Sequence, residues 1–393
     1  MGDLDPISRR TQTSFAAAAG LLRFLMRPRD LGHPEACDFM AGNPQELAPP
    51  EYVRAVQRAL EPDSPSYYAY GPPWRGAVEA VAHALSERLD LKLDPDDVFL
   101  TRGAASGLFL ALRTVIDPGD EVVAFSPPWF FYETMVLGES AVMVRALLTG
   151  EKFELDLNAL ERSLTPRTRA VIINSPHNPS GRIYSEDELR QLSEILGRAS
   201  QRNRRRIYLF SDEAYARILF DGNRMVTPGR FYPATFMLHT YSKILLAPSQ
   251  RAGYLAMPPS MPGREQLRMA LMAGSIAAGV TPDTAMQRAM PELERLSIDI
   301  AAIEKRRDRL VAELRRFGYQ VESPQGTFYL FPRSPIADAT EFCDWLAERR
   351  VYTLPGEAFE RPGYFRISLT ATDAMVNLAV PIFKEAVEVL AVR

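Results

Sequence analysis

The stretch RAVIINSPHNPSG, residues 169–181, joins a continuous apolar run to a loop of turn-forming residues. The run does not alternate between apolar and polar side chains, and it is rich in β-branched residues, which is typical of a strand buried on both faces. Such strands occur in parallel sheets whose faces are covered by helices. The stretch therefore predicts an α/β fold.

Similar short runs recur on both sides of this stretch and alternate with helical segments. One helical segment follows at residues 185–196, where Ser185 and Glu188 have the spacing of a capping box. The alternation favours a mostly parallel sheet, in which ligands bind beyond the carboxyl ends of the strands. The other expected strands are DDVFLT (96–101), DEVVAF (120–125), RIYLFSDEAY (206–215), TFMLHTYSK (235–243) and GYLAMP (253–258).

The pattern changes beyond about residue 285. Residues 292–318 read as one long amphipathic helix that ends at a glycine, and shorter elements follow it. We therefore expect a large domain over residues 48–280 and a smaller α+β domain built from residues 1–47 and 281–393.

Composition excludes several classes of partner. The 393 residues carry a net charge of −3, so no basic field attracts nucleic acid or an anionic membrane. The apolar runs are too short to span a bilayer, and the N-terminal residues lack the pattern of a signal peptide. Cys37 and Cys343 lie far apart, without ligand or disulfide spacing. We expect a cytoplasmic protein that binds neither nucleic acid nor membrane.

Histidines and basic runs point to no additional site. His177 and His239 flank the loops described below, but no third ligand stands at metal spacing, so we expect no bound metal. The basic run RNRRR (202–206) falls at the end of an expected helix, where cations suit the helix dipole.

Four clusters of polar or small residues follow the expected strands. TRGAAS (101–106) lies between a strand and a helix, where backbone N–H groups can approach an anion, although similar turns begin many helices that bind nothing. NSPHNPSG (174–181) is either a plain tight loop or a loop that presents the amide of Asn178 to a ligand.

The third cluster is SDEAY (211–215), at the end of the next strand. A buried Asp212 needs a cationic or donating partner, either in a structural ion pair or in a ligand. Tyr215, three residues further on, can face the same space.

The fourth cluster is HTYSKILLAPSQRAGY (239–254). Ser242 and Arg251 can bind a phosphate, and Lys243 can form a Schiff base if burial lowers its pKa, although a lysine near an arginine is more often a solvated pair. Together the four clusters place lysine, aspartate, asparagine, tyrosine, serine and arginine at successive strand ends. That set can hold an aldehyde cofactor that has a pyridine nitrogen, a phenolic oxygen and a phosphate.

The combined pattern resembles the fold-type I pyridoxal-5'-phosphate-dependent enzymes of the class I/II aminotransferase family, which are aspartate aminotransferase-like. The resemblance covers roughly residues 38–385 and implies a large domain with a mostly parallel seven-stranded sheet flanked by helices, beside a smaller α+β domain. The matching motifs are NPSG (178–181), Asp212 with Tyr215, Ser242 and Lys243 with Arg251 eight residues after the lysine, Pro355 with Gly356, and Arg366 in FRISL.

The resemblance implies the roles of the central residues. Lys243 binds the cofactor aldehyde as a Schiff base and then moves a proton between the substrate Cα and the cofactor. Asp212 pairs with the pyridine nitrogen, while Tyr215 and Asn178 donate to the phenolic oxygen. Arg366 clamps the substrate α-carboxylate with its fork of donors, beside Asn178.

The resemblance also implies the surrounding contacts. Trp129 stacks on the cofactor ring, and the backbone at Gly42 approaches the substrate. Tyr68 reaches the phosphate bound by a neighbouring subunit, which implies a homodimer. The residues expected to bind the phosphate within the chain are Gly103, Ala104, Ala105, Ser242 and Arg251.

Two segments depart from the family pattern. Ser249 stands where a glycine is usual, and residues 67–80, which border the active site, lack the usual glycine and leucine–arginine pattern and contain Trp74 and Arg75 as insertions. Because of the second departure, Tyr67 or Tyr70 can take the role assigned to Tyr68.

The sequence therefore predicts a pyridoxal-phosphate-dependent aminotransferase that moves an amino group between an L-amino acid and a 2-oxo acid. A lyase, decarboxylase or synthase on the same fold is the alternative, because the motif residues stabilise a shared carbanion without deciding its fate. A non-catalytic cofactor-binding sensor is more remote, since the residues before about position 40 are too few for a linker and a DNA-binding domain. The donor, the acceptor and the pathway stay open.

Overall fold

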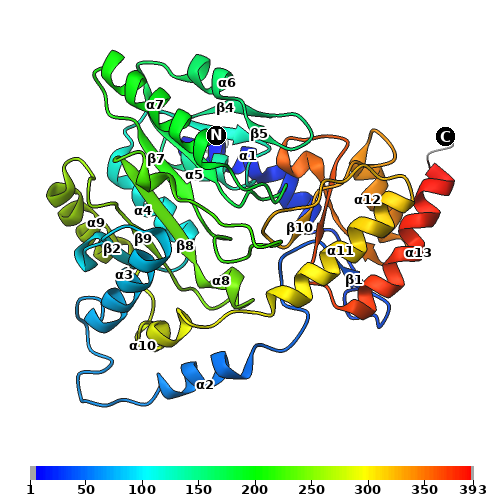
Figure 1. The fold of residues 1–393 in the computed structure, drawn as a ribbon, viewed down its shortest axis with the longest axis horizontal. Helices are drawn as coiled ribbons and strands as arrows, with labels where there is room; N and C mark the ends of the chain where they lie inside the picture. Colours follow the sequence, from blue (N-terminus) through cyan, green and yellow to red (C-terminus); the bar gives the residue numbers. More distant parts are fainter. Residues whose placement is uncertain (1–5, 391–393) are drawn as a thin grey trace.

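The centre of the molecule is an eight-stranded sheet in a computed structural model that describes residues 6–390 (Figure 1). Positions 1–5 and 391–393 of the expected small domain lie outside the described residues. The strand order is β2-β9-β8-β7-β6-β3-β4-β5. The bounds are β2 (Val98–Thr101), β3 (Glu121–Ser126), β4 (Val142–Thr149), β5 (Glu154–Leu155), β6 (Thr168–Asn174), β7 (Tyr208–Asp212), β8 (Thr235–Thr240) and β9 (Gly253–Ala256).

Five adjacent strands, β4, β3, β6, β7 and β8, run parallel to one another. β9 is antiparallel to both β8 and β2, and β5 is antiparallel to β4. The expected α/β fold with a mostly parallel sheet is thus confirmed. The resemblance implied seven strands, and the sheet has eight, of which the two-residue β5 is a short edge strand.

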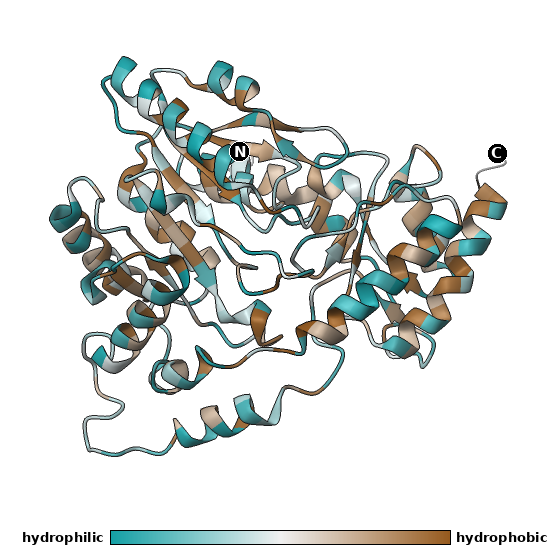
Figure 2. Cartoon of the chain, in the orientation of Figure 1, coloured by the Kyte–Doolittle hydropathy of each residue, from teal (hydrophilic) through white to brown (hydrophobic). Residues whose placement is uncertain are grey.

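The sheet is buried in its middle, as the continuous apolar runs predict. Every residue of β7 and β8 is buried, and Figure 2 shows brown, apolar residues concentrated in these central strands. α4 (Ala104–Val115) packs against β8 and β9, while α5 (Tyr132–Gly138) and α6 (Leu157–Ser163) pack against β4. These helices exclude water from the strands that carry the candidate site.

The helix after β6 begins where the sequence predicts. In α7 (Glu186–Arg202) the Ser185 side chain accepts from the backbone N–H of Glu188, and the Glu188 carboxylate accepts from that of Ser185, so the capping box is confirmed. The other helices around the sheet are α2 (Pro50–Arg58), α3 (Arg75–Leu89), α8 (Tyr241–Ile244), α9 (Arg264–Ala278) and α10 (Thr284–Leu293), with short 3₁₀ turns η1 (Pro95–Asp97) and η2 (Pro228–Arg230).

The C-terminal part is α+β. Three antiparallel strands in the order β10-β13-β12 lie near α11, α12 and α13, at the right of Figure 1. The bounds are α11 (Ile300–Arg316), α12 (Ala339–Ala347), α13 (Asp373–Leu390), β10 (Tyr329–Leu330), β11 (Val351–Tyr352), β12 (Leu354–Pro355), β13 (Phe365–Ser368) and η3 (Gly356–Phe359).

The single helix expected over residues 292–318 was wrong at its start. The chain leaves α10 at Leu293 and begins α11 only at Ile300, because the Asp299 side chain caps the new helix by accepting from the backbone N–H of Ala302. The helix ends near Gly318, which has a φ of +97°, in agreement with the expected glycine stop.

The N-terminal segment contacts both parts of the molecule. α1 (Arg9–Leu25) packs against α5, where Ser14 donates to the backbone carbonyl of Thr134 at 2.8 Å. β1 (Cys37–Asp38) instead pairs in parallel with β11 in the C-terminal part. The division into domains at residues 47 and 281 stays a prediction.

Candidate active site

Lys243 lies in α8, a single helical turn that follows β8 directly. Thr240 caps this turn by accepting from the backbone N–H of Ser242, and the N–H of Ile298 donates to the carbonyl of Ile244 at 2.9 Å. The lysine is half-buried, and its Nζ lies 5.8 Å from the centroid of the Tyr215 ring. The turn therefore holds one primary amine at the carboxyl edge of the sheet.

Asp212 ends β7 at the same edge, paired in register with Asn174 of β6 and Leu238 of β8. Its Oδ2 accepts from the Tyr132 hydroxyl at 2.5 Å, and its Oδ1 accepts from the backbone N–H of Ala214 at 3.1 Å. Burial raises the pKa of Asp212, while these two hydrogen bonds and the charge of Lys243 act against that rise.

A chain of hydrogen bonds connects β7 to Arg366. The Asn174 amide donates to the backbone carbonyl of Asp212 at 2.8 Å, and its carbonyl oxygen accepts from the backbone N–H of Asn178 at 2.7 Å. Asn178 in turn accepts from Nη1 of Arg366 at 2.9 Å. The predicted loop residue Asn178 thus lies between the sheet edge and the strand β13 that carries the arginine.

Arg366 is a buried cation without an acidic partner among residues 6–390. It is 3% exposed, its Nη2 donates to the carbonyl of Met40 at 2.8 Å, and its Nε is buried with no hydrogen-bond partner. Its guanidinium lies 3.9 Å from the ring centroid of Tyr329 and 4.9 Å from that of Phe359. A buried, unpaired guanidinium is suited to a carboxylate ligand.

A second cation lies at the start of α4. Arg251 donates to the Ser242 hydroxyl at 3.4 Å and to the carbonyl of Pro248 at 2.6 Å, and no carboxylate pairs with it in the part of the chain that the structure describes. Burial lowers the pKa of Arg251. Gly103 precedes α4 with a φ of +87°, and a Cβ there would lie 2.9 Å from Nη2 of Arg251.

This helix start is suited to an anion. No side chain caps α4, so the first-turn N–H groups, including those of Ala104 and Ala105, are free of side-chain acceptors. Gly253 lets β9 approach closely, since a Cβ there would clash with the carbonyl of His239 and lie 2.7 Å from Cα of Gly103. The predicted phosphate residues are therefore brought together.

Gly42 and Trp129 also lie at the site. A Cβ on Gly42 would clash with the Phe328 ring and lie 2.6 Å from the Tyr329 hydroxyl. The Trp129 ring packs edge-to-face against Tyr132 at 5.3 Å between centroids. Trp129 thus stands beside the tyrosine that contacts Asp212, and the roles predicted for Gly42 and Trp129 stay predictions.

Tyr68 is not brought to these residues within one chain. Its side chain is 57% exposed and its hydroxyl donates to the carbonyl of Leu60. Tyr67 is buried and donates to the carbonyl of Ala59 at 2.6 Å. Tyr70 is fully exposed.

Two residues of the site, Tyr132 and Tyr329, were missed in the sequence. Tyr329 accepts from the Tyr215 hydroxyl at 3.4 Å; burial opposes ionisation of Tyr329, but the charges of Arg366 and Lys243 bring its pKa below the usual value. Tyr132 is close in sequence to the predicted Trp129, yet neither tyrosine stands at a strand end of the sheet, where we expected ligand residues.

The two histidines near the site have structural roles. His177 bonds to the Ser180 hydroxyl at 2.7 Å and to the carbonyl of Pro127 at 2.9 Å, and burial lowers its pKa to about 4. Burial lowers the pKa of His239 to about 3. Residues 6–390 contain no group of three metal-ligating side chains.

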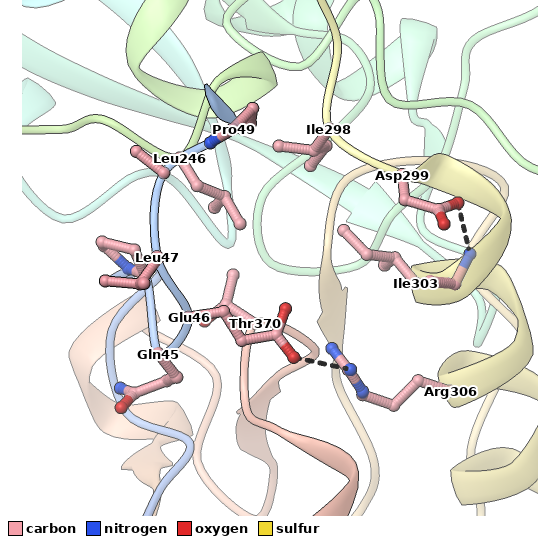
Figure 3. A pocket seen from close by; sticks show the side chains of 13 residues that line it. Gln45, Glu46, Leu47, Pro49, Leu246, Ile298, Asp299, Ile303, Arg306 and Thr370 are labelled. Carbon is pink, nitrogen blue, oxygen red and sulfur yellow. Dashed lines mark hydrogen bonds and ion pairs between the residues drawn. The ribbon is translucent and has the colours of Figure 1, made fainter. Parts of the chain in front are cut away.

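A separate pocket lies close to the lysine turn (Figure 3). It is enclosed by residues 44–49, by Leu246 and by the start of α11, where Arg306 carries an ion pair with Glu46 at 3.8 Å. None of the residues assigned to the site lines this pocket, although Leu246 donates its N–H to the carbonyl of Lys243.

A family model described as aminotransferase class I and II matches residues 35–382. The chain belongs to the class I and II aminotransferases. It is an aminotransferase, and the family uses pyridoxal phosphate. The motifs that carried the resemblance thus led to the correct family.

Named relatives of this aminotransferase agree with the assignment. The aspartate/prephenate aminotransferase of Thermus thermophilus is 31% identical over 87% of the chain and 89% of its own length. A probable N-succinyldiaminopimelate aminotransferase of Mycobacterium tuberculosis is 31% identical over 83% of both. The crystal structure of an aminotransferase from Eubacterium rectale superposes with a TM-score of 0.86 at 28% identity, covering 98% of this chain and 96% of that one.

The close approach at Gly253 generates a prediction about stability. Gly253→Ala should destabilise the protein by about 2 kcal/mol, because the added methyl group meets backbone atoms that cannot rotate away. Gly197→Ala is the matched control, since Gly197 lies within α7 with open space around it and alanine favours a helix by up to about 1 kcal/mol. The free energy of unfolding of both variants is measured by urea denaturation. Equal values for the two variants would show that β9 can shift to accommodate the added methyl group.

Proposed function

We propose that this aminotransferase binds pyridoxal phosphate at Lys243 and moves an amino group between an L-amino acid and a 2-oxo acid. The observation that carries the proposal is that Arg251 and Arg366 lie near one lysine and neither has a carboxylate partner among residues 6–390; Arg366 is buried, whereas Arg251 keeps its guanidinium accessible beside Ser242. A buried guanidinium is costly unless an anion accompanies it. A phosphate and an amino-acid carboxylate are the two anions that this reaction provides.

The residues present are suited to the cofactor. Its phosphate would be held by Ser242, Arg251 and the N–H groups after Gly103, and Trp129 would cover its ring. Asp212 would pair with the ring nitrogen, and the phenolic oxygen would face Tyr215 and Asn178. When bound, the cofactor supplies an aldehyde for the amino group and a ring that accepts electrons.

The side chains of the chain itself would perform the remaining tasks. Arg366 orients the substrate by its carboxylate, while Asn178 and Met40 hold the guanidinium in place. The Lys243 amine would be the base that takes the proton from the substrate Cα and the acid that delivers it to the cofactor carbon. Asp212 must stay ionised to hold a proton on the ring nitrogen, and its two hydrogen bonds favour that form.

A lyase, decarboxylase or synthase would use the same anchors. The names of the relatives favour transamination, and the substrates in those names, aspartate, prephenate and N-succinyldiaminopimelate, belong to those proteins. We propose an L-amino acid and a 2-oxo acid as the substrate class, without a choice of side chain.

The proposal is tested by the visible absorption spectrum of the full chain with pyridoxal phosphate. The wild type should show a visible band that an L-amino acid removes and a 2-oxo acid restores. Lys243→Ala should lack the band and lose at least about a thousandfold in rate, because it loses the proton-transfer group. Lys305→Ala, on the exposed face of α11, should behave as the wild type.

Two results would count against the proposal. A visible band of unchanged strength in Lys243→Ala would exclude this lysine as the attachment point. A wild-type band that amino acids shift, but that no 2-oxo acid restores, would favour elimination or decarboxylation over transamination.

The role of Arg366 makes a second prediction. Arg366→Gln should lower kcat/KM for amino acids by about a hundredfold, because two charge-assisted hydrogen bonds to the carboxylate are lost. Arg316→Gln, an exposed arginine that pairs with Glu313, is the control and should leave kcat/KM unchanged. kcat/KM is measured by steady-state kinetics with one amino acid. An unchanged kcat/KM in Arg366→Gln would show that the substrate carboxylate does not bind to Arg366.

We also propose a homodimer whose partner contributes a tyrosine to the phosphate. Tyr70 is suited to that role better than Tyr68, because the hydroxyls of Tyr67 and Tyr68 already donate within the chain, whereas Tyr70 is fully exposed. An apolar stripe of exposed side chains on α9, formed by Met269, Met272 and Ile276, supports an association surface.

The choice of tyrosine can be tested directly. Tyr70→Phe should raise the dissociation constant of pyridoxal phosphate by about tenfold through loss of one hydrogen bond to a charged phosphate. Tyr68→Phe is the control and should leave that constant unchanged. Equilibrium dialysis measures both, and sedimentation gives the oligomeric state. The reverse ranking of the two variants would return the role to Tyr68.

We also propose that the protein is located in the cytoplasm. Both cysteines, Cys37 and Cys343, are buried free thiols, which suits a reducing compartment. Within residues 6–390, no helix is long and apolar enough to cross a membrane.

A further inference from the structure

The closest polar contact to the Asp212 side chain comes from Tyr132, the first residue of α5. The two groups are fully enclosed: Tyr132 is 2% exposed and Asp212 is 9% exposed. The hydroxyl has no other hydrogen-bond partner among the described residues, and its 2.5 Å contact is typical of a hydroxyl that donates to a charged carboxylate.

Few other groups compensate the Asp212 charge. Lys243 on α8 acts on it from a distance, and no arginine of residues 6–390 forms an ion pair with it. Tyr215 and Glu213 follow it in the turn after β7; burial raises the pKa of both groups, and the charge of Asp212 acts in the same direction. Besides the N–H of Ala214, the Tyr132 hydroxyl is therefore the group that stabilises the anionic form by direct contact.

Tyr132 is also held firmly in place. Its backbone N–H donates to the carbonyl of Trp129 at 3.0 Å, and its ring packs edge-to-face on the Trp129 ring. The backbone and the ring of Tyr132 are thus both anchored, while its hydroxyl donates to Oδ2 of Asp212.

We propose that Tyr132 is a positioning residue that keeps Asp212 ionised and oriented, and thereby sets how tightly the protein holds pyridoxal phosphate. The proposal rests on the function proposed above. A hydrogen bond to the charged form of an acid favours that form, so its removal lets burial raise the pKa of Asp212 further. A neutral Asp212 cannot hold a proton on the ring nitrogen of the cofactor by charge.

The test is Tyr132→Phe, which keeps the ring against Trp129 and removes only the hydroxyl. Tyr319→Phe is the matched control, because Tyr319 is also buried and donates to a backbone carbonyl, that of Phe383, at 2.9 Å. The dissociation constant of pyridoxal phosphate is measured by equilibrium dialysis at about pH 8 and about pH 6, together with the melting temperature of each variant.

Tyr132→Phe should raise the dissociation constant about tenfold, and the increase should be larger at the lower pH, where protonation of Asp212 competes. Tyr319→Phe should lower the melting temperature to a similar degree without changing the dissociation constant. Wild-type affinity in Tyr132→Phe, or equal losses of affinity in both variants, would overturn the inference. If the wild-type protein bound no pyridoxal phosphate, the proposed function would fail as well. That result differs from failure of the Tyr132 inference alone, in which the wild type binds the cofactor and Tyr132→Phe binds it equally tightly.

Discussion

The register of β6, β7 and β8 is the constraint on which the site depends. Asn174 pairs with Asp212, and Asp212 pairs with Leu238, so β6 and β7 end at one level and β8 continues beside them to Thr240. A slip of one residue would turn every side chain of a strand to the opposite face. Because α8 follows β8 at once, the same register also places Lys243 near Asp212. The relative positions of the site residues therefore depend first on how the strands pair and only then on the loops that follow them.

The site contains charged groups that the fold alone does not pair. Arg366 is buried between aromatic rings with an unbonded Nε, and Asp212 is buried with a hydroxyl and an amide as its donors. Burying such groups costs free energy, which the surrounding apolar strands must offset. The arrangement is consistent with ligands that carry a phosphate and a carboxylate, because each would reduce that cost when it binds.

The sequence predicted those parts of the site that follow from strand ends. Asp212 ends a buried apolar strand, and Asn178 and Lys243 lie in the short segments that follow such strands, a pattern that can be read from one sequence. Tyr132 and Tyr329 could not be found in this way, because each arrives from an element outside the central strands and its neighbours depend on tertiary packing. The start of α11 was missed for a related reason, since the Asp299 cap breaks a continuous amphipathic pattern.

The contacts of Arg366 restrict how a substrate can approach. Tyr329 and Phe359 lie against the guanidinium, while Asn178 and Met40 accept from two of its nitrogens, so a carboxylate must reach the remaining N–H groups along the edge. Asn178 belongs to the loop after β6, whereas Arg366 belongs to β13 in the C-terminal part. In the role proposed for this arginine, a bound substrate would contact both parts of the molecule at once. It would then be oriented only when the C-terminal strand and the sheet edge are correctly placed relative to each other.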